Sequence, residues 1–227
     1  MTHVDANQTG ATPLNLGVAK DPNQAMKLVL TGGPSGGKTT VAQAIIREFA
    51  DKVMVVPEAA SILWQGGWPR RKTLDGVMHQ QRAIFFVQRE VESLLVNEHP
   101  DKLIICDRGS LDGFAYWPDR DNPESFLTQT KTSFTEEYDR YDWVIHLDTA
   151  PEGGYDSNNP LRNETYSEAL DLNNRILKAW SGHPRRFIIG TQKSGHFIDK
   201  LNCALKIVGL ILDGHTFEEI HQAIVSY

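Results

Sequence analysis

The feature that most constrains this chain is a glycine-rich segment directly after a short apolar run. Residues 26–30 read Met-Lys-Leu-Val-Leu, and residues 31–40 read Thr-Gly-Gly-Pro-Ser-Gly-Gly-Lys-Thr-Thr. The second segment fits the pattern G-x-x-x-x-G-K-[ST], whose glycines let backbone N–H groups turn towards a polyphosphate. The residues that follow have helical character, so a positive helix end would face the same anion. The pattern predicts a strand, a phosphate-binding loop and a helix, in that order, with a nucleoside triphosphate bound at the loop.

Individual residues of this loop have distinct expected roles. Lys38 would reach the β- and γ-phosphates, and the hydroxyl of Thr39 would ligate Mg²⁺. The residues that we expect to contact the nucleotide in this loop are Gly33, Pro34, Ser35, Gly36, Gly37, Lys38, Thr39 and Thr40.

Length and charge narrow the class of protein. The chain has 227 residues and a net charge of −6. This length suits one α/β domain over 25–227 with a small lid at about 151–165, preceded by a polar tail over 1–24 that we expect to be disordered. The negative charge argues against nucleic acid or an anionic membrane as the main partner. Because the chain shows no signal peptide, no membrane-spanning run and no metal-type cysteine spacing, we expect a cytoplasmic protein.

Short apolar runs recur along the chain with helical segments between them. They lie at 28–31, 53–56, 103–106, 143–147 and 187–189, and helices are expected at 74–96, 166–180, 197–212 and 216–225. This alternation predicts an α/β fold with a five-stranded parallel sheet and helices on both faces. Such sheets bind ligands beyond the carboxyl ends of their strands. The chemistry should therefore lie in the residues that follow each strand.

Charged side chains follow the second and third predicted strands. Glu58 could accept a proton from a substrate hydroxyl or hold Mg²⁺ through water, or it could simply complement a helix dipole. Asp107 fits a second carboxylate for Mg²⁺. Arg108 stands where motor-type ATPases usually carry a glutamate that activates water, and it could clamp an acceptor or a transferring phosphoryl group. This favours transfer to a bound acceptor, although a surface ion pair between Asp107 and Arg108 is the alternative.

Four further polar residues are candidates for ligand contacts. Gln81 and Gln88 lie on the apolar stripe of the helix expected at 74–96, so each either contacts a substrate ring or sugar or is bonded within the core. Arg162 ends a loop rich in Gly, Asp, Asn and Pro, and could stabilise charge on the γ-phosphoryl group or form a surface ion pair. Gln192 follows the fifth strand, beside the expected position of the base. Because the chain has no Asn-Lys-x-Asp signature for guanine, adenine is favoured.

Several motifs, in this order, resemble those of a known family. They are the phosphate loop, Val-Pro-Glu at 56–58, Gln88 with Glu92, Asp-Arg-Gly at 107–109, Asp112 with Tyr116, and Arg162 with Glu164. Together they resemble the kinase-like AAA-domain family of small P-loop proteins over roughly 26–212. That family includes relatives of the ribosylnicotinamide-kinase domain of a bacterial NAD-biosynthesis regulator and of the P-loop domain of the eukaryotic TRPL-translocation-defect protein. The resemblance implies a three-layer αβα P-loop NTPase fold like that of nucleoside and nucleotide kinases, with Glu58 as base and Arg108 as acceptor clamp.

The sequence thus predicts a small-molecule kinase that uses ATP and Mg²⁺. Thr39 and Asp107 would hold the metal, Lys38 and Arg162 would neutralise developing charge, and the acceptor would be an unidentified small molecule. The alternative is a regulatory switch that hydrolyses ATP or GTP slowly and presents different surfaces in its two states. Neither the acceptor nor the oligomeric state can be read from the sequence.

Overall fold

The computed structural model describes residues 25–154, 165–190 and 197–225. Five parallel strands form one sheet in the order β2-β3-β1-β4-β5, which confirms the predicted sheet. The strands are β1 (Lys27–Thr31), β2 (Val53–Val56), β3 (Leu103–Asp107), β4 (Trp143–Leu147) and β5 (Arg186–Ile189). Their bounds differ from the predicted ones by one residue at most. Since β1 is central, the loops after β3, β1 and β4 lie side by side at one edge of the sheet.

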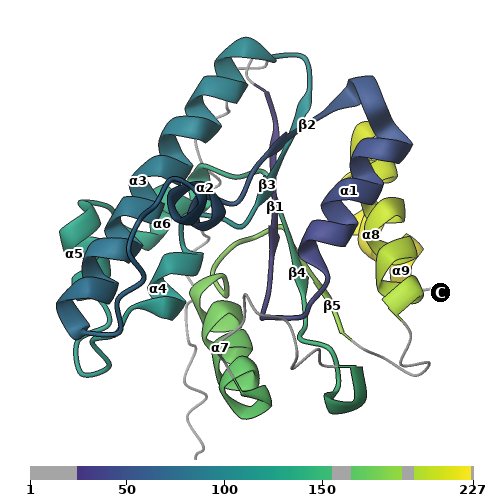
Figure 1. The fold of residues 1–227 in the computed structure, drawn as a ribbon. Coiled ribbons are helices and arrows are strands. Elements are labelled where there is room, and N and C mark those ends of the chain that lie inside the picture. Colours follow the sequence, from purple (N-terminus) through teal and green to yellow (C-terminus); the bar gives the residue numbers. More distant parts are fainter. Residues whose placement is uncertain (1–24, 155–164, 191–196, 226–227) are drawn as a thin grey trace, which may run out of the picture.

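Helices cover both faces of this sheet (Figure 1). The predicted long helices are present as α1 (Lys38–Phe49), α3 (Leu74–Glu98), α7 (Tyr166–Ala179), α8 (Phe197–Leu212) and α9 (Phe217–Val225). Four helices of seven residues or fewer were not predicted: α2 (Ala59–Gln65), α4 (Asp112–Tyr116), α5 (Ser125–Thr130) and α6 (Phe134–Asp139). Helices this short complete at most two turns, so they leave no clear 3.6-residue period in the sequence. Two 3₁₀ turns, Ala50–Lys52 and Glu152–Gly154, complete the described elements.

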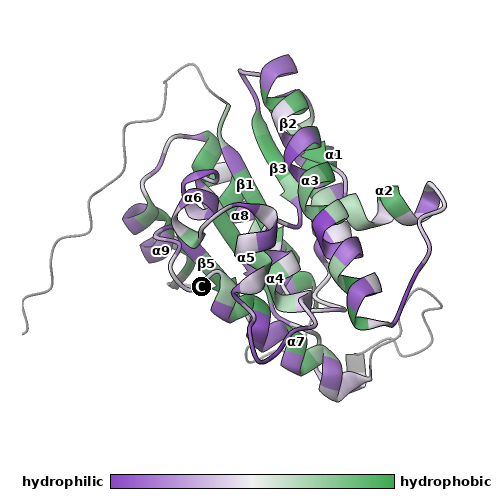
Figure 2. Cartoon of the chain, turned by 90° about the vertical axis from the view of Figure 1, so that its left-hand side faces the viewer, coloured by the Kyte–Doolittle hydropathy of each residue, from purple (hydrophilic) through white to green (hydrophobic). Residues whose placement is uncertain are grey.

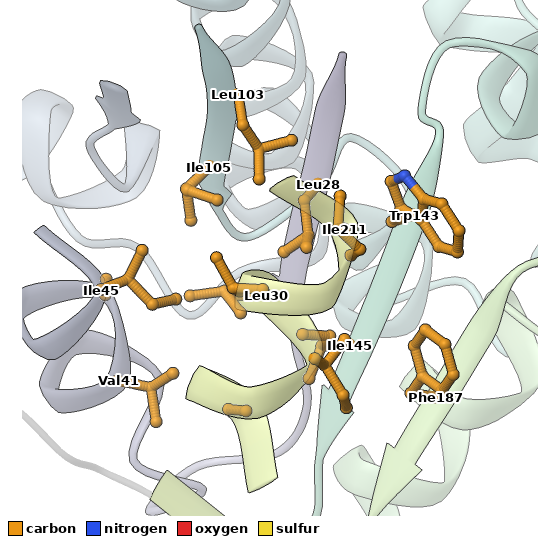
Figure 3. Packing of buried hydrophobic residues seen from close by; sticks show 14 of the residues in the cluster. Leu28, Leu30, Val41, Ile45, Leu103, Ile105, Trp143, Ile145, Phe187 and Ile211 are labelled. Atoms are coloured by element: carbon orange, nitrogen blue, oxygen red, sulfur yellow. The ribbon is translucent and has the colours of Figure 1, made fainter. Parts of the chain in front are cut away.

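Alternation along each strand divides the core between the two faces. Leu28, Leu30 and Ile145 point to the face covered by α1, α8 and α9, where they pack with residues such as Ile45 and Ile211 (Figure 3). The intervening residues, such as Val29 and Val144, pack on the opposite face against α3, α4 and α7. Strands that are buried on both sides are therefore almost continuously apolar, as the green colour of β3 in Figure 2 shows.

Local sequence fixes where the helices flanking the functional edge begin. The side chain of Thr73 accepts a hydrogen bond from Gly76 N–H at 3.3 Å and caps α3. Thr165 and Glu168 form a reciprocal capping box at the start of α7.

No helix in the described ranges is long and apolar enough to cross a bilayer.

Candidate active site

The phosphate loop connects β1 to α1 at the carboxyl edge of the sheet. Gly32 and Gly37 have positive φ angles of 127° and 88°, which L-residues rarely adopt. A Cβ on Gly32 would also lie 2.0 Å from the carbonyl oxygen of Leu147. The hydroxyl of Ser35 is buried and has no hydrogen-bond partner among the described residues. Because buried polar atoms are normally paired, this hydroxyl is available to a ligand of the loop.

Lys38 extends its ammonium group across this loop. It is only 8% exposed, and its Nζ donates to the carbonyl oxygens of Gly32 at 2.9 Å and Gly33 at 2.8 Å. Burial lowers the pKa of Lys38 to about 7, and the charge of Arg108 acts in the same direction. Neighbouring carboxylates only partly offset these effects. A polyphosphate bound in the loop would add the nearby negative charge that favours the protonated form of Lys38 and raises its pKa again.

Thr39 and Asp107 form a pair of oxygen donors beside the loop. The Thr39 hydroxyl lies 3.3 Å from Asp107 Oδ2, which brings together two residues predicted from separate motifs. Burial raises the pKa of Asp107 above its usual value, and the charges of Arg108 and Lys38 partly offset that rise. One hydroxyl and one carboxylate, completed by phosphate oxygens and water, suit Mg²⁺, which prefers few protein ligands. The donor chemistry of this pair therefore fits the predicted metal.

Glu58 and Arg108 are joined across the ends of β2 and β3. Arg108 Nε donates to Glu58 Oε1 at 2.6 Å, and Arg108 Nη1 lies 3.3 Å from Asp112 Oδ2. Burial alone would raise the pKa of Glu58, but the charge of Arg108 and hydrogen bonds from Ser61 and Arg108 outweigh it and lower the pKa. The carboxylate is therefore ionised and oriented. Arg108 does not form the alternative surface ion pair with Asp107, because its guanidinium group binds Glu58 and Asp112.

Asp112 at the start of α4 organises this side of the site. It is 2% exposed, and its Oδ1 accepts hydrogen bonds from the hydroxyl of Thr31 at 2.6 Å and from the indole of Trp180 at 2.8 Å. Its other oxygen faces Arg108. From the sequence, Asp112 is identified only as part of a family motif, with no role of its own.

The structure separates the roles of the two glutamines on α3. Gln88 donates to Glu92 at 2.9 Å and to the backbone carbonyl of Arg108 at 3.1 Å, so it is bonded within the core. It thereby holds Arg108, whose φ is 74°, in a conformation unusual for a residue with a side chain. Gln81 is 5% exposed and lies close to Gly113 of α4, and its amide forms no hydrogen bond with the described residues. Its amide can therefore receive a ligand.

Two of the predicted ligand contacts, Arg162 and Gln192, lie outside the described residues, so their roles remain predictions. Arg175 on α7 pairs with Asp171 at 3.0 Å and donates to the carbonyl of Ala115, which ties α7 to α4. The sequence pattern also gave no role to Asn173 and His146, which lie beside the phosphate loop.

Comparison with known proteins supports the architecture. Residues 27–196 match a family described as AAA domain. Deoxyadenosine kinase from M. mycoides, solved with dATP, superposes with a TM-score of 0.54 at 14% identity, over 83% of this chain and 100% of that one. NadR protein, solved with NAD and AMP-PNP, gives a TM-score of 0.56 at 14% identity, over 85% of this chain and 50% of that one. No curated protein matches the chain.

At such identity the superpositions establish a nucleoside-kinase-like fold and nothing finer. The family match covers most of the chain and includes the phosphate loop and the strands around it. The chain therefore belongs to the family of AAA domains with a kinase-like P-loop fold.

Proposed function

We propose that this protein transfers the γ-phosphoryl group of ATP to a hydroxyl of a small, nucleoside-like molecule. The observation that carries the proposal is the Glu58–Arg108 pair, which lies at the same sheet edge as the phosphate loop. The charges of Arg108, Asp107, Asp112 and Glu58 all act on Lys38, so these groups surround one site. An NTPase that only hydrolyses its nucleotide has no need of a paired carboxylate and guanidinium placed to orient an acceptor.

The residues divide into a donor side and an acceptor side. On the donor side, Lys38 and the loop from Gly33 to Thr40 would hold the triphosphate, while Thr39 and Asp107 would hold Mg²⁺. Bound Mg·ATP would supply the phosphoryl group and the metal's positive charge. Arg162 and Gln192 complete the proposed donor contacts, with the γ-phosphoryl group and the base respectively.

On the acceptor side, Arg108 would orient the acceptor and the Glu58 carboxylate would receive its hydroxyl proton. The acceptor oxygen forms a bond to the γ-phosphorus as the bond from that phosphorus to the β,γ-bridging oxygen breaks, and ADP leaves. Little covalent work falls to the protein in such a transfer, so the positioning of these groups is the main source of catalysis.

The class of acceptor is inferred from the unpartnered amide of Gln81. A side-chain amide offers one donor edge and one acceptor edge, which match the edge of a heterocyclic base. The structural neighbours are consistent with this choice, because their structures contain dATP in one case and NAD with AMP-PNP in the other. We therefore propose a nucleoside or a related ring-bearing metabolite as the acceptor.

The test is the consumption of ATP by purified protein, with and without a panel of nucleosides and a pooled metabolite extract, followed by mass spectrometry. A product that gains one phosphoryl group is expected. Glu58→Gln should bind ATP normally but lose roughly 10²- to 10⁴-fold in transfer, the usual contribution of a general base. Glu90→Gln, an exposed substitution on α3, is the matched control and should transfer normally.

The opposite result would favour the regulatory switch. Slow ATP loss that no metabolite stimulates, together with an unaltered rate in Glu58→Gln, would remove the acceptor role from the Glu58–Arg108 pair. The remaining function of the phosphate loop would then be nucleotide-dependent binding.

A further inference from the structure

Asn173, in the middle of α7, is hydrogen-bonded to the phosphate loop. It is 5% exposed, and its Oδ1 accepts from the backbone N–H of Gly33 at 3.0 Å and of Thr149 at 3.3 Å. The same oxygen lies 3.0 Å from His146 Nε2, while Asn173 Nδ2 donates to Asp148 at 3.0 Å. Because the two backbone donors identify the oxygen, His146 must carry its proton on Nε2. One amide thus joins three segments of the chain.

The contact between α7 and the loop is close as well as polar. A Cβ built on Gly33 would lie 2.1 Å from Thr149 Oγ1 and 2.8 Å from Asn173 Cβ. Only a glycine therefore allows the loop to approach α7 and the segment after β4 this closely. The position of Gly33, and with it the start of the phosphate loop, depends on α7.

The same helix holds the acceptor side of the site. Arg175, half a turn after Asn173, donates to the carbonyl of Ala115 in α4. Trp180, directly after α7, donates its indole N–H to Asp112, which in turn faces Arg108. Figure 1 shows α7 below the sheet, beside α4 and close to the start of α1. A single helix therefore contacts both the loop that holds the donor and the residues that hold the acceptor.

We infer that Asn173 is a positioning residue that fixes the phosphate loop against α7 and so couples nucleotide binding to the acceptor-side pair of Asp112 and Arg108. The inference rests on the proposed function, since it assumes that a nucleotide occupies the loop. Asn173 does not itself need to touch the nucleotide. Its effect passes through the backbone of Gly33 on one side and through α7 to Trp180 on the other.

The first measurement is the affinity of Asn173→Ala for Mg·AMP-PNP. The substitution removes the side-chain oxygen that accepts hydrogen bonds from the N–H groups of Gly33 and Thr149. These buried groups are then left without a partner, so the affinity for Mg·AMP-PNP should fall on the order of tenfold. KM for ATP should rise by a similar factor with a smaller change in kcat. A variant that is only partly folded would instead show a lower kcat with an unchanged KM. Asn174→Ala, the exposed neighbour on the same helix, should match the wild type.

The second measurement follows the indole N–H of Trp180 by NMR, with the resonance assigned through Trp180→Phe. Adding Mg·AMP-PNP should shift this resonance in the wild type, and at saturating nucleotide the shift should be reduced by at least half in Asn173→Ala. Asn173→Leu, which keeps the branched shape of the side chain but offers no hydrogen-bond acceptor, should behave in the same way and serves if the alanine variant does not fold.

Two outcomes separate this inference from the function on which it rests. If Lys38→Ala binds Mg·AMP-PNP as tightly as the wild type, the nucleotide does not occupy the loop and the proposed function fails. If Lys38→Ala loses affinity while Asn173→Ala and Asn173→Leu keep it, the loop binds nucleotide without help from α7. In that case only the inference about Asn173 is wrong. The coupling would also be overturned if the indole N–H resonance of Trp180 in the wild type did not shift when Mg·AMP-PNP is added.

Discussion

At the residue scale, one guanidinium controls the ionisation of the proposed base. Arg108 holds the pKa of Glu58 below its usual 4.5 although burial acts in the opposite direction. Arg108→Met keeps the bulk of the side chain and removes its charge, so burial should then dominate and raise the pKa of Glu58 above 4.5. The pH titration of the side-chain carboxyl carbon by ¹³C NMR measures this directly, and Glu58→Gln identifies the resonance.

The sign of the accompanying stability change follows from linkage. In the wild type, the folded-state pKa lies below the unfolded one, so the ionised Glu58 stabilises the fold above pH 4.5, and this contribution disappears as the pH falls through the lowered pKa. In Arg108→Met the same carboxylate would destabilise the fold once ionised. A pKa of Glu58 that stays below 4.5 in the variant would contradict this account.

At the element scale, the loop after β3 packs directly against the end of α7. A Cβ on Gly109 would lie 2.4 Å from Cζ2 of the buried Trp180 and 3.0 Å from Val29 Cγ1. Gly109→Ala should therefore destabilise the protein by about 1–3 kcal/mol, the usual cost of overpacking a filled core. Urea denaturation gives the value. Gly153→Ala is the control, because a Cβ at this position would meet no atom of the described residues within 4 Å, and it should change the stability by less than about 0.5 kcal/mol.

The elements also show how far the sequence could predict the structure. Apolar runs and long helical periods located all five strands and the five long helices, because burial of whole faces leaves a repeated signal. The glycine motif and the charged residues after β2 and β3 pointed to the edge of the sheet where the loop and the Glu58–Arg108 pair lie, because parallel strands bring their carboxyl ends to one edge. The hydrogen bonds of Asn173 and the central place of Asp112 could not be predicted in this way. They depend on contacts across 140 and 81 residues of chain, which no local pattern encodes.

At the scale of the whole molecule, the sheet separates two hydrophobic clusters. Ile207 of α8 belongs to the cluster on one face and Ile176 of α7 to the cluster on the other, and both are fully buried. Either residue replaced by alanine should cost about 2–5 kcal/mol of the free energy of unfolding. Because the two side chains belong to separate clusters on opposite faces of the sheet, the double variant Ile176→Ala/Ile207→Ala should lose the sum of the two values within about 0.5 kcal/mol.

Denaturant unfolding of the wild type, the two single variants and the double variant measures the coupling free energy between the two substitutions. The two faces of the sheet also differ in their relation to the candidate site. Ile176 shares α7 with Asn173, whereas Ile207 lies on the face away from that helix. Ile176→Ala should therefore weaken the affinity for Mg·AMP-PNP by more than its effect on folding explains, and Ile207→Ala should leave the affinity of the folded protein unchanged. Coupling above 1 kcal/mol between the two substitutions would show that the sheet transmits strain from one cluster to the other, and the site would then depend on the packing of both faces.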